Sequence, residues 1–375
     1  MQDIDARVWQ LLAESERLPL SSAQLELLQE AVRLADAHQR TDLGIAARWP
    51  LMTVARTLLR GDVLTVAFTW CLAEYDRDPR QFHGQHLFWQ YQMVIGQLAN
   101  LADVSRAKLE QLLDDLERRL QAAGRSLVPV YITQRSIAAD LGDRALARAA
   151  NESIRRHLLA HGGGEYVGER RDEIETAIFL GEEEEALRLA QPLLTGNLPR
   201  DGAEAEAGCS ALLLLPLLKR RRLAEAERLA RRCSRFFHPE QCYYWSYGDL
   251  LKWLTLTNKL GRAVRVYEGC QRAIHSFTDP LTRLHFALDA IVLFDRLRQE
   301  KRQSLPLRLP DEVPVPSSDG HYRIEALHDY LLREADELAE RFDRRNGTNY
   351  FRDQIQERRE LQRWAMGEPA RPRGD

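Results

Sequence analysis

Apolar residues recur at three- and four-residue spacing along most of the chain, and from Leu141 to Ile274 they follow one repeated pattern. Each copy has a helix-breaking residue or its replacement, a few polar residues, a small apolar residue five positions on, and apolar spacing to a helix end. The copies begin, in steps of 39, 40 and 37 residues, at Gly142, Gly181, Arg221 and Asn258. The residue five positions on is Ala147, Ala186, Ala226 or Ala263. A fixed step in this range predicts stacked helical hairpins.

The physical basis of the pattern is the packing of two helices against each other. Glycine takes a left-handed backbone without strain, so it can stand where one helix ends and the next begins. A small alanine lets the two helix backbones approach where they cross. Apolar residues at three- and four-residue spacing lie on one face of a helix. Because one hairpin cannot bury that face alone, neighbouring hairpins must stack into a curved rod.

One copy of the pattern resembles a known family. The stretch LGEEEEAL at residues 180–187 resembles the link into the second helix of a tetratricopeptide repeat. Members of that family often close the second helix with a proline, and here Pro79 and Pro239 stand 18 residues after Gly61 and Arg221. We therefore interpret the region that begins at Gly61 as a degenerate early copy of the repeat.

The copies depart from that family in two respects. Their steps exceed the family period of about 34 residues, and Arg221 and Asn258 stand where the family has glycine. HEAT-like and other α-solenoid units therefore also fit the pattern. The resemblance covers about Leu43 to Phe294 and implies an all-α, right-handed superhelical α-solenoid.

The predicted domain organisation is one long repeat array with a different carboxy-terminal part. We expect about seven or eight tetratricopeptide-like hairpins, within residues 1–300. Four prolines forbid a continuous helix in residues 301–320, which are predicted to run extended across a surface. Charged amphipathic helices in residues 321–366 suit the capping of a solenoid end. Residues 367–375 are predicted to form a disordered tail.

Composition and charge exclude some classes of partner. A net charge of −3 gives no overall electrostatic reason to bind nucleic acid or an anionic membrane. The strongest basic stretch begins at Lys219–Arg222, but Glu225 and Glu227 interleave the arginines that follow. We interpret it as a solvated helix surface rather than a phosphate-binding stripe. The longest apolar run, residues 211–218, is far too short to span a bilayer.

The amino terminus and the cysteines both indicate the compartment of the protein. The chain starts without the basic and apolar leader of a signal peptide. The cysteines are widely spaced, odd in number and mostly inside helical patterns, which predicts buried free thiols in a reducing cytoplasm. They are Cys71, Cys209, Cys233, Cys242 and Cys270.

Catalytic and metal-binding signals are weak. The stretch HGGG at residues 161–164 resembles the oxyanion-hole motif of some esterases, but the chain has no Gly-x-Ser-x-Gly elbow. His157 and His161 have a spacing that suits zinc on one helix face, without a recognisable third ligand. His238 with its neighbouring cysteines is a similarly incomplete cluster. We therefore predict no catalytic site, no metal and no cofactor.

An aromatic stretch before Asn258 provides the candidate binding site. If Asn258 corresponds to the repeat glycine, Tyr247 and the leucines that follow it fall at core positions between helices. Five residues then remain for a concave groove that could hold an extended peptide between an aromatic platform and both charges. They are Tyr244, Trp245, Asp249, Lys252 and Thr255. The alternative is that the aromatics, including Trp253, fill a thick helical core.

The sequence-based hypothesis is a non-enzymatic cytoplasmic scaffold that binds a protein or peptide segment on its concave face. The alternative is a regulatory sensor, in which the solenoid binds a small molecule or signal peptide and changes curvature. An enzyme that acts through an unrecognised constellation, with His157 or Glu175, ranks third. The identity of the partner does not follow from the sequence.

Overall fold

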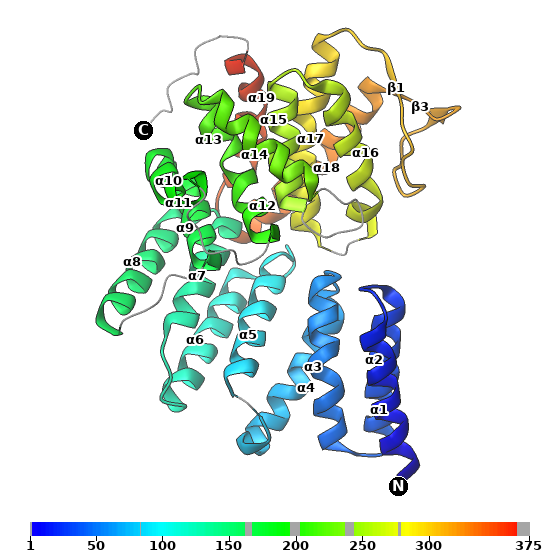
Figure 1. Cartoon of the computed structure of the whole chain (residues 1–375), viewed down its shortest axis with the longest axis vertical. Coiled ribbons are helices and arrows are strands. Elements are labelled where there is room, and N and C mark those ends of the chain that lie inside the picture. The colour runs from blue at the N-terminus through cyan, green and yellow to red at the C-terminus, as the bar shows by residue number, and fades with distance from the viewer. Residues whose placement is uncertain are drawn as a thin grey trace. The chain divides into compact units, whose positions relative to one another are not determined.

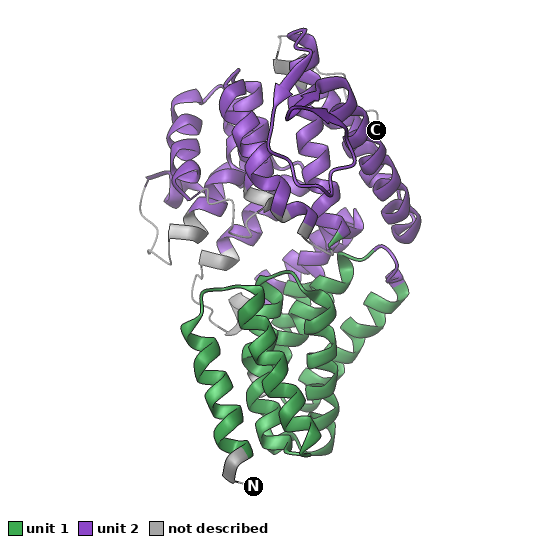
Figure 2. Ribbon diagram, turned by 90° about the vertical axis from the view of Figure 1, so that its right-hand side faces the viewer, with its two compact units in different colours: residues 1–101, 107–133, 277–279 green, residues 102–106, 134–276, 280–375 purple. Residues whose placement is uncertain are grey.

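The computed structural model describes residues 2–82, 84–161, 167–195, 203–236, 244–276 and 279–365, except for some side chains near the edges of these ranges. The chain divides into two compact units (Figure 2). Unit 1 comprises residues 1–101, 107–133 and 277–279, and unit 2 comprises residues 102–106, 134–276 and 280–375. Each unit is described by itself below.

Unit 1 is a stack of helices in which each helix packs against the next, from α1 to α5 (Figure 1). A short 3-10 helix, Pro79–Gln81, separates α4 from α5. The core of unit 1 consists of apolar side chains spaced along one face of each helix, as their periodicity predicts. The helices are α1 (Gln2–Arg17), α2 (Ser22–Ala37), α3 (Thr41–Thr57), α4 (Gly61–Arg77), α5 (Gly84–Ala99), α6 (Arg106–Ala122) and the first part of α7 (Val128–Leu141).

Unit 2 is also built of packed helices and ends with α18 and α19. Among its packed pairs are α15 with α16, α15 with α17, and α17 with α18 and α19. The helices are the end of α7, α8 (Arg144–His161), α9 (Val167–Phe179), α10 (Glu183–Leu189), α11 (Gln191–Thr195), α12 (Ala203–Leu212), α13 (Leu214–Lys219), α14 (Leu223–Arg235), α15 (Tyr244–Leu256), α16 (Leu260–Ser276), α17 (Pro280–Gln299), α18 (Ile324–Asn346) and α19 (Tyr350–Ala365).

The proline-containing segment between α17 and α18 has no helix and forms a small antiparallel sheet. Its strands are β1 (Ser304–Pro306), β2 (Ser317–Ser318) and β3 (His321–Arg323), in the order β1-β3-β2. Side chains alternate between buried and exposed positions along β1 and the residues after it, because successive side chains of an extended chain point to opposite sides. The segment is thereby fixed to unit 2 by its buried apolar residues. These are Leu305, Leu307, Val313 and Val315.

The predicted all-α class is confirmed, because the described residues are helical apart from this sheet and the connecting turns. The superhelical stacking into seven or eight hairpins stays a prediction. The predicted tail, residues 367–375, lies outside the described residues.

The turn that opens each copy of the repeat has one conformation throughout. Gly142, Gly181, Arg221 and Asn258 all have a left-handed backbone, with φ of 66°, 79°, 56° and 59°. In each case the amide of the following residue donates to a carbonyl five residues earlier, as Arg222 N does to Leu217 O at 2.9 Å. This is the Schellman ending of a helix. The next helix starts two residues after the left-handed residue.

Among the described residues the same turn occurs at five further places, and it corrects the position assigned to Gly61. They are left-handed and are followed by the same hydrogen bond, at Gln39, Leu59, Gly124, Lys301 and Gly347. Gly61 is instead the first residue of α4. The left-handed residue of this early copy is therefore Leu59, two positions before Gly61.

The small residues five positions after the turns are buried, as the pattern predicts. Ala147, Ala186, Ala226 and Ala263 are all 0% exposed. The prediction of buried free thiols is confirmed for the described residues, in which Cys71, Cys209, Cys233 and Cys270 are free and buried. Cys242 lies outside the described residues.

Replacement of Ala226 by leucine tests the packing of these repeats. Because Ala226 is fully buried, the larger side chain should overpack the helix crossing and lower the free energy of unfolding by about 1–3 kcal/mol. Urea denaturation followed by circular dichroism measures the change. Ala224→Leu on the same helix is the control, since Ala224 is exposed and its replacement should be nearly neutral. Equal effects of the two changes would contradict the assigned register.

Candidate functional site

The residues predicted to line a groove on α15 have different surroundings from those expected. The Lys252 side chain is only 6% exposed, and its Nζ lies 2.9 Å from Asp249 Oδ1 and 3.0 Å from Asp289 Oδ1. Thr255 is buried, and its hydroxyl donates to Leu251 O at 2.8 Å. The prediction that Lys252 and Thr255 line an open groove is therefore wrong. Both side chains are satisfied within unit 2.

A helix from the carboxy-terminal part of the chain packs where the groove was expected. Arg358 of α19 donates from Nε to Asp289 Oδ1 at 3.0 Å, and α19 packs along α17. Asp289 thus accepts from a cation on each side, Lys252 of α15 and Arg358 of α19. The sequence pattern of α15 contained no signal of this cover, because Arg358 lies more than 100 positions later.

The corner between α18 and α19 holds the covering helix in place. The carboxylate of Asp343 accepts from Phe351 N at 2.9 Å and from Arg352 N at 3.1 Å, so it caps the first turn of α19. Asn346 donates to Asp140 O, the carbonyl of a residue in the last turn of α7, at 2.9 Å. The start of α19 is thereby tied to the start of the helical array in unit 2.

Electrostatics in this cluster differ between its two carboxyl groups. Burial raises the pKa of Asp249, and the Asp289 carboxylate adds to this effect, while the Lys252 ammonium opposes both. Burial also raises the pKa of Asp289, but Lys252 and Arg358 outweigh it and the net shift is downward. Asp289 is therefore the ionised centre of the cluster at neutral pH. Its stabilising contribution is complete above the unfolded-state pKa and is lost as the pH falls through the lower folded-state pKa.

Gly248 provides a test of how rigid this cluster is. A Cβ at Gly248 would lie 2.1 Å from Asp289 Oδ2. The carboxylate cannot turn away freely, because its other oxygen holds Lys252 and Arg358. We expect Gly248→Ala to lower the free energy of unfolding by about 1–3 kcal/mol, measured by urea denaturation.

The control is Gly261→Ala in α16, where a Cβ has open space. In an Asp289→Ala background the clashing carboxylate is gone, so Gly248→Ala should cost less than in the wild type. Simple additivity of Gly248→Ala and Asp289→Ala would contradict the clash, since residues in contact couple.

The aromatic residues of α15 belong to the core, as the alternative interpretation predicts, wherever the structure describes them. Tyr247 is 4% exposed and Trp253 is 2% exposed. The Lys259 ammonium lies 4.1 Å from the centroid of the Trp253 ring and covers it. The side chains of Tyr244 and Trp245 lie outside the described residues. Their role in binding stays a prediction.

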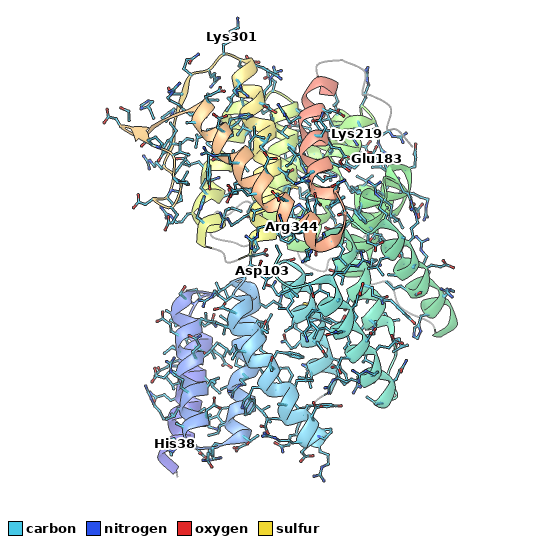
Figure 3. The ribbon with its side chains drawn as sticks, turned by 180° about the vertical axis from the view of Figure 1, so that it is seen from behind. His38, Asp103, Glu183, Lys219, Lys301 and Arg344 are labelled. Carbon is cyan, nitrogen blue, oxygen red and sulfur yellow. The ribbon has the colours of Figure 1, made fainter. Side chains whose placement is uncertain are left out.

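The basic stretch that begins at Lys219 is paired with acidic residues of the preceding repeat. Lys219 of α13 forms an ion pair with Glu183 of α10 (Figure 3), and Arg220 does so with Glu184. Arg222, the residue just before α14, pairs with Glu225 of that helix at 2.6 Å. These ion pairs therefore link neighbouring helices at the protein surface. This agrees with the interpretation of the basic stretch as a solvated helix surface.

The structure bears on the metal and membrane expectations only for the residues that it describes. Among these, no three or more metal-binding side chains come together. The side chain of His161 and the whole of His238 lie outside the described residues. None of the helices within the described ranges combines the length and apolar character needed to cross a bilayer.

An exposed aromatic surface in unit 1 is the strongest candidate for binding. Trp49, Thr53 and Arg56 recur on α3 at helical spacing, and His86 and Trp89 do so on α5. The rings of Trp49 and His86 meet edge to face with centroids 6.3 Å apart. The Arg56 guanidinium lies 5.3 Å from the Trp89 ring centroid. We call these five residues the tryptophan–arginine patch.

Exposure in this patch is high for such side chains. Trp89 is 42% exposed, and Thr53 and His86 are exposed as well, while Trp49 and Arg56 are half-buried. Tryptophan and arginine are the residue types most enriched at the energetic centres of protein interfaces. A surface of unit 1 that presents both types on two of its helices has the composition of a binding site.

The charge of Arg56 is not balanced within the described part of the chain. Nearby Arg48 and Arg60 form ion pairs with Asp36 and Asp62, each at 2.7 Å. Arg56 has no such pair there, and its Nε is buried without an acceptor. Burial lowers the pKa of Arg56. Its guanidinium therefore has no counterion among the described residues.

Sequence reasoning missed this patch although its signal was present. The chain from residue 85 to 98 is visibly rich in aromatics. Phe88 and Tyr91 are buried whereas Trp89 is exposed. Which of these rings is buried depends on the face of α5 that packs against its neighbouring helix. The lack of an acidic partner for Arg56 likewise depends on residues from other helices.

No protein-family model matches the chain, and no curated protein matches it. The resemblance to tetratricopeptide repeats therefore stays a prediction, which is supported by the recurring left-handed turns and the buried alanines.

Proposed function

We propose that this protein is a non-enzymatic helical-repeat scaffold, of tetratricopeptide type, that binds a peptide segment of a partner protein at the tryptophan–arginine patch. The observation that carries the proposal is Arg56, whose half-buried guanidinium lies 5.3 Å from the Trp89 ring centroid and has no ion-pair partner among the described residues. Helix surfaces of this kind offer apolar rings for side chains and a cation for a carboxylate.

The chemistry of the patch indicates the kind of segment that it fits. The rings of Trp49 and Trp89 favour an aliphatic or proline side chain, because burial of apolar surface stabilises the complex. The planar fork of Arg56 favours a carboxylate, with which it can form two parallel hydrogen bonds. We therefore expect a segment with an acidic residue next to an apolar one.

Two further properties support parts of the proposal. The four buried free thiols suit a reducing compartment, so we place the protein in the cytoplasm. On α15 the polar residues Lys252 and Thr255 are buried, and α19 packs along α17 beside them. We therefore propose the binding surface in unit 1 rather than on α15.

The test is selection of peptides from a displayed random library against the full chain, followed by fluorescence polarisation of the selected peptides with single variants. Trp89→Ala and Arg56→Ala should each weaken binding by about tenfold or more, as expected for interface residues worth about 1.4–2 kcal/mol. Arg56→Lys should also weaken binding, because an ammonium cannot form the bidentate contact.

Trp9→Ala is the matched control, since Trp9 is a 55% exposed tryptophan of unit 1 outside the patch. Circular dichroism and thermal melting check that each variant is folded. Peptides that bind Trp89→Ala and Arg56→Ala as tightly as they bind the wild type would refute the assigned surface. A selection without any acidic and apolar consensus would refute the assigned segment chemistry.

A further inference from the structure

A cavity of about 580 Å³ lies in unit 2 where α17 ends and the sheet and α18 begin. All of its lining residues are polar or charged. Four of them are cations and two are carboxylates, namely Arg298, Lys301, Arg302 and Arg323 against Asp295 and Glu325. A pocket of this size matches a small ligand. The absence of aromatic and aliphatic side chains from its lining argues against a nucleoside base.

Both carboxylates of this cavity are already engaged. Glu325 forms a two-point contact with Arg298, at 2.9 Å to Nε and 2.9 Å to Nη2. Asp295 lies 2.9 Å from Nε2 of His328, a ring that is 2% exposed. Arg298 also lies 3.3 Å from Nδ1 of that ring. One cation, Arg298, is thus neutralised by Glu325 and also contacts the buried ring of His328.

The other three cations have no ion pair with any described residue. Lys301, Arg302 and Arg323 are exposed at the cavity, and Lys301 is labelled in Figure 3. With four cations against two carboxylates, the lining carries an excess of two positive charges around one polar space. Like charges held close together repel, so this arrangement favours a bound anion.

The backbone fixes the positions of these three residues. Arg302 N donates to Leu297 O at 3.2 Å in the left-handed turn at Lys301. Arg323 pairs with Ser304 across β1 and β3, and Ile324 N donates to Gln303 O at 3.0 Å. Three cations from two separate parts of the chain are therefore brought to one cavity by regular hydrogen bonding, rather than by flexible loops.

We propose that this cavity binds a small multivalent oxyanion of the phosphate class. Arginine forks match phosphate oxygens in pairs, and Lys301 adds a point charge. The site belongs to unit 2 and shares no residue with the tryptophan–arginine patch. It is thus a second binding function, in the direction of a small-molecule sensor, and it does not depend on the peptide-binding proposal.

Isothermal titration of the full chain with inorganic pyrophosphate, at constant chloride concentration, tests this proposal. We expect saturable binding at one site, and at least about tenfold weaker binding for the double variant R302A/R323A, because this variant removes two of the three lining cations that have no ion pair with a described residue. Arg344→Ala is the control: it removes an exposed arginine of α18 that pairs with Glu340 on the same helix (Figure 3). That variant should bind like the wild type.

Thermal melting without anion checks that the variants are folded, and pyrophosphate should raise the melting temperature of the wild type but not of R302A/R323A. No binding to the wild type, or equal weakening in R302A/R323A and Arg344→Ala, would overturn the site. Citrate that binds as tightly as pyrophosphate would overturn the phosphate class. Peptide binding at the patch should survive in R302A/R323A, so the two proposals fail separately.

Discussion

The left-handed turn that joins successive helices is the constraint on which the helical array depends. The left-handed conformation lets a helix end and another begin two residues later, and it recurs at Gly142, Gly181, Arg221 and Asn258. In these four copies the residue five positions on is a fully buried alanine. Glycine suits the turn best, but another residue there adds only local strain, whereas a larger residue in place of the alanine would overpack the helix crossing. This explains why the four alanines recur while the glycine is replaced twice.

The same repeat geometry determines which charges are structural. Polar residues near the turns of adjacent hairpins lie opposite each other, so Lys219 pairs with Glu183 and Lys259 pairs with Glu227. Asp289 serves in a similar way between α15 and α19. Such paired charges fix neighbouring helices but leave little for a partner. The groups available for recognition are those without a counterion, and Arg56 is the clearest case in unit 1.

We propose recognition at two chemically different surfaces. The tryptophan–arginine patch of unit 1 combines aromatic rings with one cation, which would suit a peptide. The cavity of unit 2 is wholly polar and carries more cations than carboxylates, which would suit a small anion. In this proposal the scaffold and sensor hypotheses concern different sites of the chain.

The sequence by itself determined the helical class, the step of the repeat and the burial of the alanines, because these depend on short-range spacing along a helix. Tertiary structure decided which polar side chains are accessible. The local sequence predicts Lys252 as a groove residue. In the structure it is buried against Asp289, which also binds Arg358 of α19, a residue far away in the sequence. Leu59 takes the left-handed turn that Gly61 seemed to mark, because the preceding helix ends there. Trp89 is exposed and Phe88 buried through the phase of α5 against its neighbours. Local periodicity fixes helices, whereas a site depends on contacts between residues that the sequence keeps apart.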